Sequence, residues 1–163
     1  MKPRITYRNL PQLFLKARDS LMSHFRPILN RFGLTDQQWR ILRTLDEYAQ
    51  LEPREICSHC QILSSSMAGV LARMEELALI ERQRVVGDQR RVVVRLALKG
   101  DQLVREIAPL IDQQYQLIEQ ALGKPIFDEL FSSLETFIAA QETPVEHIEL
   151  PPATQALPPT ISP

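Results

Sequence analysis

The stretch LIERQRVVGDQRRVVVRLALKG, residues 79–100, decides the fold class of this 163-residue chain. Charged and apolar residues alternate through residues 80–86 and again through residues 91–98, and Gly-Asp-Gln-Arg separates the two runs at residues 87–90. A period of two interrupted by turn-forming residues is typical of a β-hairpin. The stretch therefore predicts a hairpin, and we expect it to be the only strand pair in the chain.

Two helices are predicted immediately before the hairpin. Pro53 is favoured at the first position of a helix that ends near Cys60. The next helix begins at Ser64, Ser65 and Ser66, each of which can cap its N-terminus. Its expected buried face contains Val70, Leu71, Met74, Leu77 and Leu79 or Ile80. Two helices joined by only a few residues predict a helix-turn-helix, and the hairpin that follows makes it a winged helix.

Apolar residues recur at spacings of three and four outside this module, which predicts further helices. Thr35 opens one of them as an N-cap, with Gln38 three positions later in a capping-box pattern. The expected helices occupy residues 10–32, 35–47, 99–122 and 125–140. The predicted fold is therefore mainly α with a small β-hairpin wing, arranged as a winged helix-turn-helix.

The net charge of −1 hides a strong asymmetry along the chain. Residues 1–100 contain 17 Lys and Arg against 10 Asp and Glu, a net charge of +7. Residues 101–163 contain 2 against 10, a net charge of −8. Such a difference between halves indicates one surface for an anionic partner.

Several classes of protein are excluded by what the sequence lacks. No apolar stretch approaches the roughly 18 to 20 residues that cross a bilayer, and the N-terminus has no secretory apolar core, so we expect a cytoplasmic protein without membrane contact. The five glycines form no phosphate-binding loop. No nucleophile, base and orienting group stand together, so no catalytic residue and no enzyme activity are predicted.

The charge distribution within the winged module predicts DNA binding. Seven arginines fall on it, at positions 54, 73, 82, 84, 90, 91 and 95. The planar donor fork of arginine suits phosphate oxygens and narrow grooves, while serine and glutamine donate to phosphates or base edges. The alternative for any single arginine is a solvated face. The candidate DNA-binding residues are Arg54, Ser64, Ser65, Ser66, Met67, Arg73, Asp88, Gln89, Arg90 and Arg91.

Two motifs resemble the MarR family of bacterial regulators. Leu79–Arg82, Gly87–Arg91 and Leu96–Gly100 are similar to its wing signature, and Leu34–Leu42 to its second-helix motif. With the helix order, the likeness covers about residues 10–140. Ala97 stands where the family commonly has a capping threonine. The resemblance implies that Asp88 braces the wing through an ion pair, whereas the residue type alone indicates a turn former.

A narrower likeness concerns the first two predicted helices. The runs Ala17-Arg18-Asp19, Met22-Ser23, Phe25-Arg26-Pro27 and Gln37–Arg43 resemble the subgroup that controls homoprotocatechuate, hydroxycinnamate and related aromatic-acid catabolism. The resemblance implies a dimeric repressor that a small aromatic carboxylic acid releases from double-stranded DNA, with no cofactor.

The first two predicted helices and the helix at residues 99–122 contain residue types that can bind an aromatic carboxylate. Arginine, serine and histidine donors can hold a carboxylate in a cleft with apolar and aromatic walls. The candidate ligand-binding residues are Arg18, Met22, Ser23, His24, Trp39, Arg40, Arg43, Ile111 and Tyr115. Two alternatives remain open: His24 is a surface residue, and Arg40 and Arg43 pair with Asp36, Glu47 or the acidic C-terminal helices.

The sequence Cys57-Ser58-His59-Cys60 resembles half of a zinc site. A tetrahedral site needs four ligands and no second pair exists, so no metal site is predicted. Both cysteines lie on the apolar side of a short helix, and we interpret them as small buried hydrophobes. The alternative function is a redox- or metal-responsive regulator of the same fold that uses Cys57 and Cys60.

The terminal helices carry more apolar side chains than one winged helix can cover, which predicts a homodimer. A two-fold dimer places two recognition helices about one DNA turn apart and so predicts a palindromic operator. We expect a dimerisation and ligand-pocket helix in residues 1–34, the winged helix-turn-helix in residues 35–98, dimerisation helices in residues 99–141 and a proline-rich disordered tail in residues 142–163.

Overall fold

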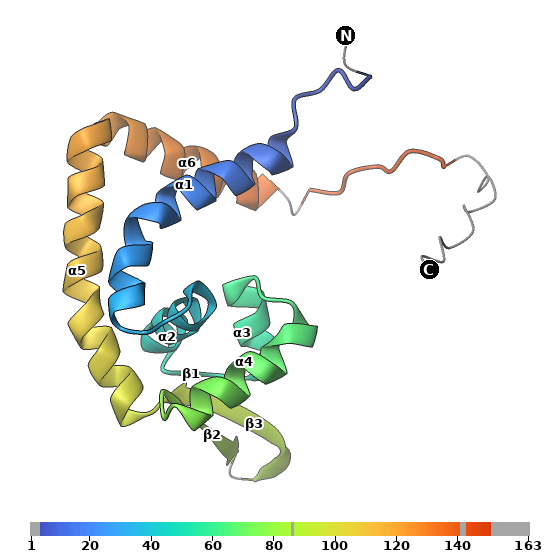
Figure 1. Ribbon diagram of the computed structural model, residues 1–163. Helices are drawn as coiled ribbons and strands as arrows, with labels where there is room; N and C mark the ends of the chain where they lie inside the picture. The colour runs from blue at the N-terminus through green and yellow to red at the C-terminus, as the bar shows by residue number, and fades with distance from the viewer. Residues whose placement is uncertain (1–3, 86, 141–142, 151–163) are drawn as a thin grey trace, which may run out of the picture. The chain divides into compact units, whose positions relative to one another are not determined.

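The computed structural model describes residues 4–85, 87–140 and 143–150, with only the backbone of Gln89. These ranges are mainly helical with a small sheet, which confirms the predicted fold class (Figure 1). The elements in chain order are α1 Leu10–Arg31, α2 Asp36–Tyr48, β1 Gln50–Leu51, α3 Pro53–Cys60, α4 Ser64–Glu76, β2 Ile80–Val85, β3 Asp88–Leu96, α5 Leu98–Leu122 and α6 Lys124–Ala140.

The sheet has three strands rather than the two of a lone hairpin. β2 and β3 form the predicted antiparallel hairpin. Its register begins with Ile80 opposite Leu96 and shifts between Arg84 and Val85. The expectation of a single strand pair is wrong, because β1 pairs with the other edge of β3, with Gln50 opposite Arg95. A strand of two residues has no period that a sequence pattern can reveal.

The hairpin turn is also tighter than expected. β3 begins at Asp88, so Arg90 lies in the strand rather than in the turn. Gly87 adopts φ +92°, a left-handed conformation that only glycine enters at little steric cost. The reversal is therefore made close to Gly87.

The helix N-termini follow the sequence prediction at one helix and depart from it at another. At α2 the Thr35 hydroxyl accepts from the amide of Gln38 at 3.2 Å, and the Gln38 side chain accepts from the amide of Thr35 at 2.9 Å, so the predicted capping box is present. At α4 the N-cap is Leu63, without a side-chain hydrogen bond. The prediction that a serine caps α4 is wrong, because Ser64 is already the first helical residue.

The core of the winged module lies between the helices and the sheet. Helix α5 contributes the buried side chains of Val104, Ile107 and Ile111. Burying such side chains contributes about 1.5–3 kcal/mol each before the loss of chain entropy. The largest side chains that are fully buried are Leu29, Ile41, Leu42, Leu45, Ile56, Leu71, Met74, Ile80, Val94 and Ile107.

Gly100 fixes how closely α5 follows the sheet. A Cβ atom at this position would lie 2.0 Å from the carbonyl oxygen of Leu79, far inside van der Waals contact. The same oxygen accepts a hydrogen bond of 3.1 Å from the amide of Ala97. Glycine is therefore required by the close approach of two backbone segments.

Two compact units are distinguished, one up to Ile118 and one from Glu119 onward. In the second unit, Phe127 is the only buried residue of α6, and its ring centroid lies 6.3 Å from that of Phe131. Residues 143–150 are exposed and form no helix or strand, whereas the rest of the predicted tail, at 142 and 151–163, lies outside the described residues.

Within the described ranges, no helix has both the length and the apolar character needed to span a bilayer.

Candidate functional site

The first candidate surface consists of α3, α4 and the hairpin. Arg54 in the first turn of α3 and Arg73 in the last turns of α4 are exposed, as are Ser64, Ser65 and Ser66 at the start of α4. These side chains are available to an external partner. Met67 is only 3% exposed, because it points into the core between helices, and this corrects its prediction as a DNA-facing residue.

Among the described residues, Arg73, Arg82, Arg91 and Arg95 of this module are paired with carboxylates. Each pair lies at the surface, where solvent screens the attraction and the contribution to stability is about 0–1 kcal/mol. The pairs are Arg73 with Glu76 at 2.9 Å, Arg82 with Glu75 at 3.1 Å, Arg95 with Glu81 at 2.6 Å and Arg91 with Glu52. Arg54 and Arg90 are exposed and form no ion pair with any residue that the structure describes.

The pair between Arg91 and Glu52 joins the hairpin to the beginning of α3. The Nε atom of Arg91 donates to the Glu52 carboxylate at 2.7 Å, and this hydrogen bond is the main reason why the pKa of Arg91 is raised above its usual value. Glu52 is the N-cap residue of α3, and its own amide donates to the side chain of Glu55 at 2.7 Å. Arg91 therefore joins the half of the hairpin nearer its turn to the beginning of α3 in the free protein.

Asp88 acts as a turn former. Its Oδ1 atom accepts a hydrogen bond of 3.0 Å from the amide of Arg90, two residues later, which stabilises the beginning of β3. The side chain of Gln89, also predicted to contact DNA, lies outside the described residues.

The second candidate site is a cavity of about 140 Å³ between α1, α2 and α5. An engineered cavity of about 150 Å³ accommodates a benzene ring, so this volume suits one aromatic ring. Seven of the nine predicted ligand-binding residues line it, together with two that sequence reasoning did not select. The lining residues are Arg18, Met22, Phe25, Asp36, Trp39, Arg40, Arg43, Ile111 and Tyr115.

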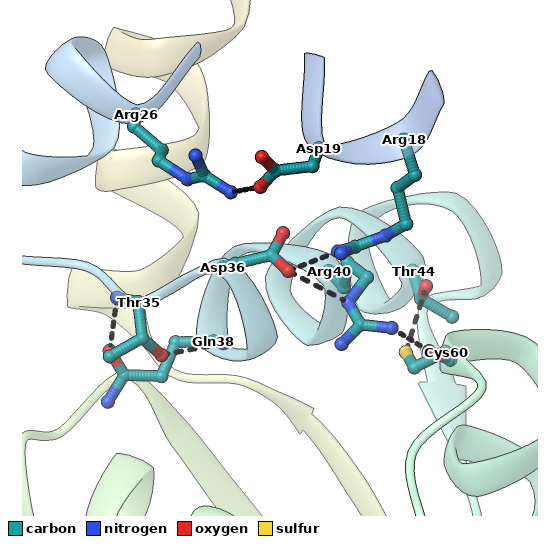
Figure 2. Close-up of polar contacts among 9 residues, drawn as sticks. All are labelled: Arg18, Asp19, Arg26, Thr35, Asp36, Gln38, Arg40, Thr44 and Cys60. Carbon is teal, nitrogen blue, oxygen red and sulfur yellow. Dashed lines mark hydrogen bonds and ion pairs between the residues drawn. The ribbon is translucent and has the colours of Figure 1, made fainter. Parts of the chain in front are cut away.

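The polar side of the cavity is positively charged. Three arginines and one aspartate line it, a formal local charge of +2. Arg18 forms an ion pair with Asp36, and Nε of Arg40 lies 3.8 Å from the same carboxylate. Figure 2 shows that the side chains of Arg18 and Arg40 both point toward Asp36. Because three guanidinium groups line the cavity and only one carboxylate does, the site favours an additional anion.

The remaining residues that line the cavity are aromatic or apolar. Trp39 is buried, and the ring of Phe25 lies against that of Tyr115 with 4.6 Å between centroids and 49° between planes. Aromatic rings at such separations attract an additional ring by the same quadrupole and dispersion forces. A flat ring with an anionic substituent matches both the cationic and the aromatic residues of the cavity.

Ser23 and His24 are not among the residues that line this cavity. The Ser23 hydroxyl donates to the carbonyl of Ser20 at 2.6 Å, and His24 is exposed. On a helix with 3.6 residues per turn, Arg18, Met22 and Phe25 share one face, whereas the two intervening positions point elsewhere. The same spacing was the signal that could have identified Phe25.

The two cysteines occupy different environments. Cys60 is buried beside the Thr44 hydroxyl, with 3.4 Å between Sγ and Oγ1, and burial raises the pKa of its thiol. Cys57 is half-buried and lines a second cavity of about 370 Å³ that also borders Arg54 and Arg82. Neither cysteine is in a disulfide. No group of three or more His, Cys, Asp or Glu residues that could hold a metal occurs in the described part of the chain.

The chain is similar to known transcriptional regulators. A MarR family model matches residues 32–91. The HTH-type transcriptional regulator FarR of Neisseria gonorrhoeae is 42% identical over 110 residues, which are 68% of this chain and 75% of FarR. The homoprotocatechuate degradative operon repressor of Escherichia coli is 36% identical over 134 residues, 82% of this chain and 90% of the repressor.

A solved structure extends this similarity to the fold. NadR in complex with 4-hydroxyphenylacetate superposes with a TM-score of 0.73 at 36% identity and covers 84% of this chain and 97% of NadR. The relatives are regulators and repressors rather than enzymes, in agreement with the prediction from the sequence.

Proposed function

Because this chain belongs to the MarR family of DNA-binding transcriptional regulators, we propose that it is a homodimeric repressor of an aromatic-acid catabolic operon. It binds a palindromic operator in the cytoplasm, and a small aromatic carboxylic acid releases it. No cofactor takes part.

DNA is bound by the winged module. Helix α4 lies in the major groove, where Ser64, Ser65 and Ser66 present hydroxyl groups, and the hairpin reaches the minor groove with Arg90. Arg54 and Arg73 contact phosphates. The exposure of these side chains supports their role, and the lack of an ion pair at Arg54 and Arg90 among the described residues supports it further.

Dimerisation uses the terminal helices, within residues 1–34 and 99–141. The first half of α1 and most of α6 expose large apolar side chains, which a monomer seldom does over continuous segments. These side chains include Leu10, Leu13 and Leu15 in one segment and Ile126, Leu130, Phe131 and Ile138 in the other. A two-fold dimer then requires a two-fold symmetric operator.

The effector binds in the cavity between α1, α2 and α5. The observation that carries this proposal is that seven residues predicted from the sequence line one cavity, whose lining includes three arginines and three aromatic residues. Arg18, Arg40 and Arg43 bind the carboxylate, while Trp39 and Tyr115 contact the ring. Two relatives support the class of effector, since one is named for homoprotocatechuate degradation and another binds 4-hydroxyphenylacetate.

Release from DNA is a shift between two conformations of the dimer. The effector favours a spacing of the recognition helices that does not match the operator. Reciprocity then requires that operator DNA weakens effector binding by the same factor.

The test is a titration of the complete chain on DNA selected by the protein from a random pool. We expect a palindromic consensus, and fluorescence anisotropy should show weaker binding when 4-hydroxyphenylacetate or a related hydroxylated benzoate, cinnamate or nicotinate is added. A shift of at least about tenfold corresponds to a coupling of about 1.4 kcal/mol. Operator affinity that no member of this panel changes would contradict the proposed mechanism.

A further inference from the structure

Arg40 has contacts at both ends of its guanidinium group. At one end Nε lies 3.8 Å from Oδ2 of Asp36, and both residues line the effector cavity. At the other end Nη1 donates to the backbone carbonyl of Cys60 (Figure 2). Within the described residues, Arg40 is thus a lining residue of the cavity that also holds the end of another helix.

The Cys60 carbonyl belongs to the turn between the two helices of the winged module. Cys60 is the last residue of α3, and Gln61 follows in the left-handed conformation with φ 50°. Carbonyl groups in the last turn of a helix have no partner within the helix, and a cation bound there also interacts favourably with the helix dipole. The bond from Arg40 therefore stabilises the turn from which α4 begins at Ser64.

The Arg40 donor that faces the cavity lacks a hydrogen-bond acceptor among the described residues. The donor is Nε, which is buried and, among the described residues, has no hydrogen-bond partner, since 3.8 Å is too long for one. Asp36 is engaged instead by Arg18. A carboxylate that enters the cavity offers Nε the acceptor that Asp36 does not provide, and a charge-assisted hydrogen bond is about twice as strong as a neutral one.

We propose that Arg40 couples the effector cavity to the recognition helix: an effector carboxylate draws its guanidinium group toward the cavity and weakens its bond to the Cys60 carbonyl. The end of α3 and the turn before α4 then loosen, which lowers the affinity of α4 for DNA. This inference rests on the proposed function for the effector. The anchoring of α3 by Arg40 is independent of it and is tested separately.

Cys60 provides the reporter for the test. The chain has two cysteines, so a Cys57→Ser background leaves the buried Cys60 as the only thiol. The rate of its reaction with N-ethylmaleimide then follows the population of molecules in which the end of α3 is open. Without ligand, Arg40→Gln should raise this rate about tenfold, the lower limit for loss of a hydrogen bond to a charged group.

Arg26→Gln is the matched control. It removes the same charge and also breaks an exposed arginine–aspartate pair, with Asp19 of the same helix, but Arg26 is not among the residues that line the cavity. Cys60 should remain as protected in this variant as in the parent, and thermal unfolding of both variants separates local opening from global loss of stability. An Arg40→Gln rate equal to that of the control would overturn the anchoring role.

The second arm adds 4-hydroxyphenylacetate, with binding measured by calorimetry. In the parent it should accelerate Cys60 labelling and weaken operator binding. In Arg40→Lys, which keeps the charge but lacks a fork that can face two acceptors at once, ligand still binds but the effect on Cys60 should be lost.

If bound ligand weakens operator binding equally in both proteins, the coupling role of Arg40 is wrong while the proposed function stands. If bound ligand leaves the operator affinity of the parent unchanged, the proposed function fails. If calorimetry shows no binding of 4-hydroxyphenylacetate to the parent, the coupling role of Arg40 is overturned together with the choice of effector, and the ligand-free arm still decides the anchoring role.

Discussion

The Glu52 carboxylate accepts a hydrogen bond of 2.7 Å from Nε of Arg91, although 39 positions separate the two residues in the chain. The bond fixes β3 to the N-terminal turn of α3 and so sets the direction in which the hairpin leaves the module.

Replacing Glu52 by Gln should cost less than about 1 kcal/mol of stability, since the pair is exposed. The amides of β3 should nevertheless exchange faster, and operator affinity should fall. Glu81→Gln, which removes the pair with Arg95 inside the hairpin, is the control; identical exchange and affinity in the two variants would contradict the anchoring role.

Arg90 and Arg91 should differ in how they affect DNA binding. Arg90 has no ion pair among the described residues and is proposed to contact DNA directly, so Arg90→Ala should weaken binding and reduce the salt slope by about one. Arg91→Ala removes an anchor of the wing, so affinity should fall with a smaller change in slope. Anisotropy titrations over a series of salt concentrations measure both. An unchanged affinity for Arg90→Ala would exclude the wing from the DNA contact.

Arg43 should affect the effector more than the operator. It is exposed, lines the cavity and forms no ion pair with the described residues. Arg43→Ala should weaken the binding of an aromatic acid about tenfold or more, because a charge-assisted hydrogen bond is lost. Arg31→Ala, in the last turn of α1 and outside the cavity lining, provides the matched loss of charge. Calorimetry measures the effector affinity, and equal values for the two variants would remove Arg43 from the site.

Gly100→Ala should destabilise the fold strongly. The new Cβ atom would lie 2.0 Å from the Leu79 carbonyl oxygen, and because that atom belongs to the backbone it cannot rotate away. Overpacking of this kind costs about 1–3 kcal/mol. Gly69→Ala in α4 is the opposite case, because nothing lies within 4 Å of the Cβ atom that alanine would add. This substitution should stabilise the helix by about 0.5–1 kcal/mol. Chemical unfolding of both variants gives the comparison, and a stable Gly100→Ala protein would show that α5 can move away from the sheet.

Cys60 should respond weakly to thiol reagents and to peroxide. Burial raises its thiol pKa, so less thiolate is present at neutral pH than for an exposed cysteine. The folded state therefore keeps this proton more tightly than the unfolded state. Above the ordinary pKa of a thiol, the unfolded state binds fewer protons, and stability should fall as the pH rises toward the folded pKa. The measurement compares how the unfolding free energies of the parent and of Cys60→Ala change between pH 8 and 10. An equal dependence on pH in both proteins would contradict a contribution from Cys60.

Oxidation of the cysteines should not control DNA binding. The half-buried Cys57 should react before Cys60, and peroxide should leave operator binding unchanged. Loss of operator binding that Cys57→Ser abolishes would favour the alternative regulator based on the cysteine pair.

Local sequence was sufficient for most elements. The alternation around Gly87 predicts the β2–β3 pair, Thr35 and Gln38 predict the capping box of α2, and Pro53 predicts the first residue of α3. Each signal lies within a few residues of its effect. The same kind of reasoning failed at Ser64, because which residue becomes the N-cap depends on where packing lets α4 begin.

The sequence by itself determined the order of the elements and the residue types available to a cavity, because helix and strand periods show which side chains share a face. Only the tertiary structure decided which faces meet. It brought Phe25 and Asp36 into the cavity, turned Met67 into the core, and joined Arg91 to Glu52 and Arg40 to the Cys60 carbonyl. These contacts connect residues that are far apart in the chain, and their geometry depends on how whole helices pack, which no local period encodes.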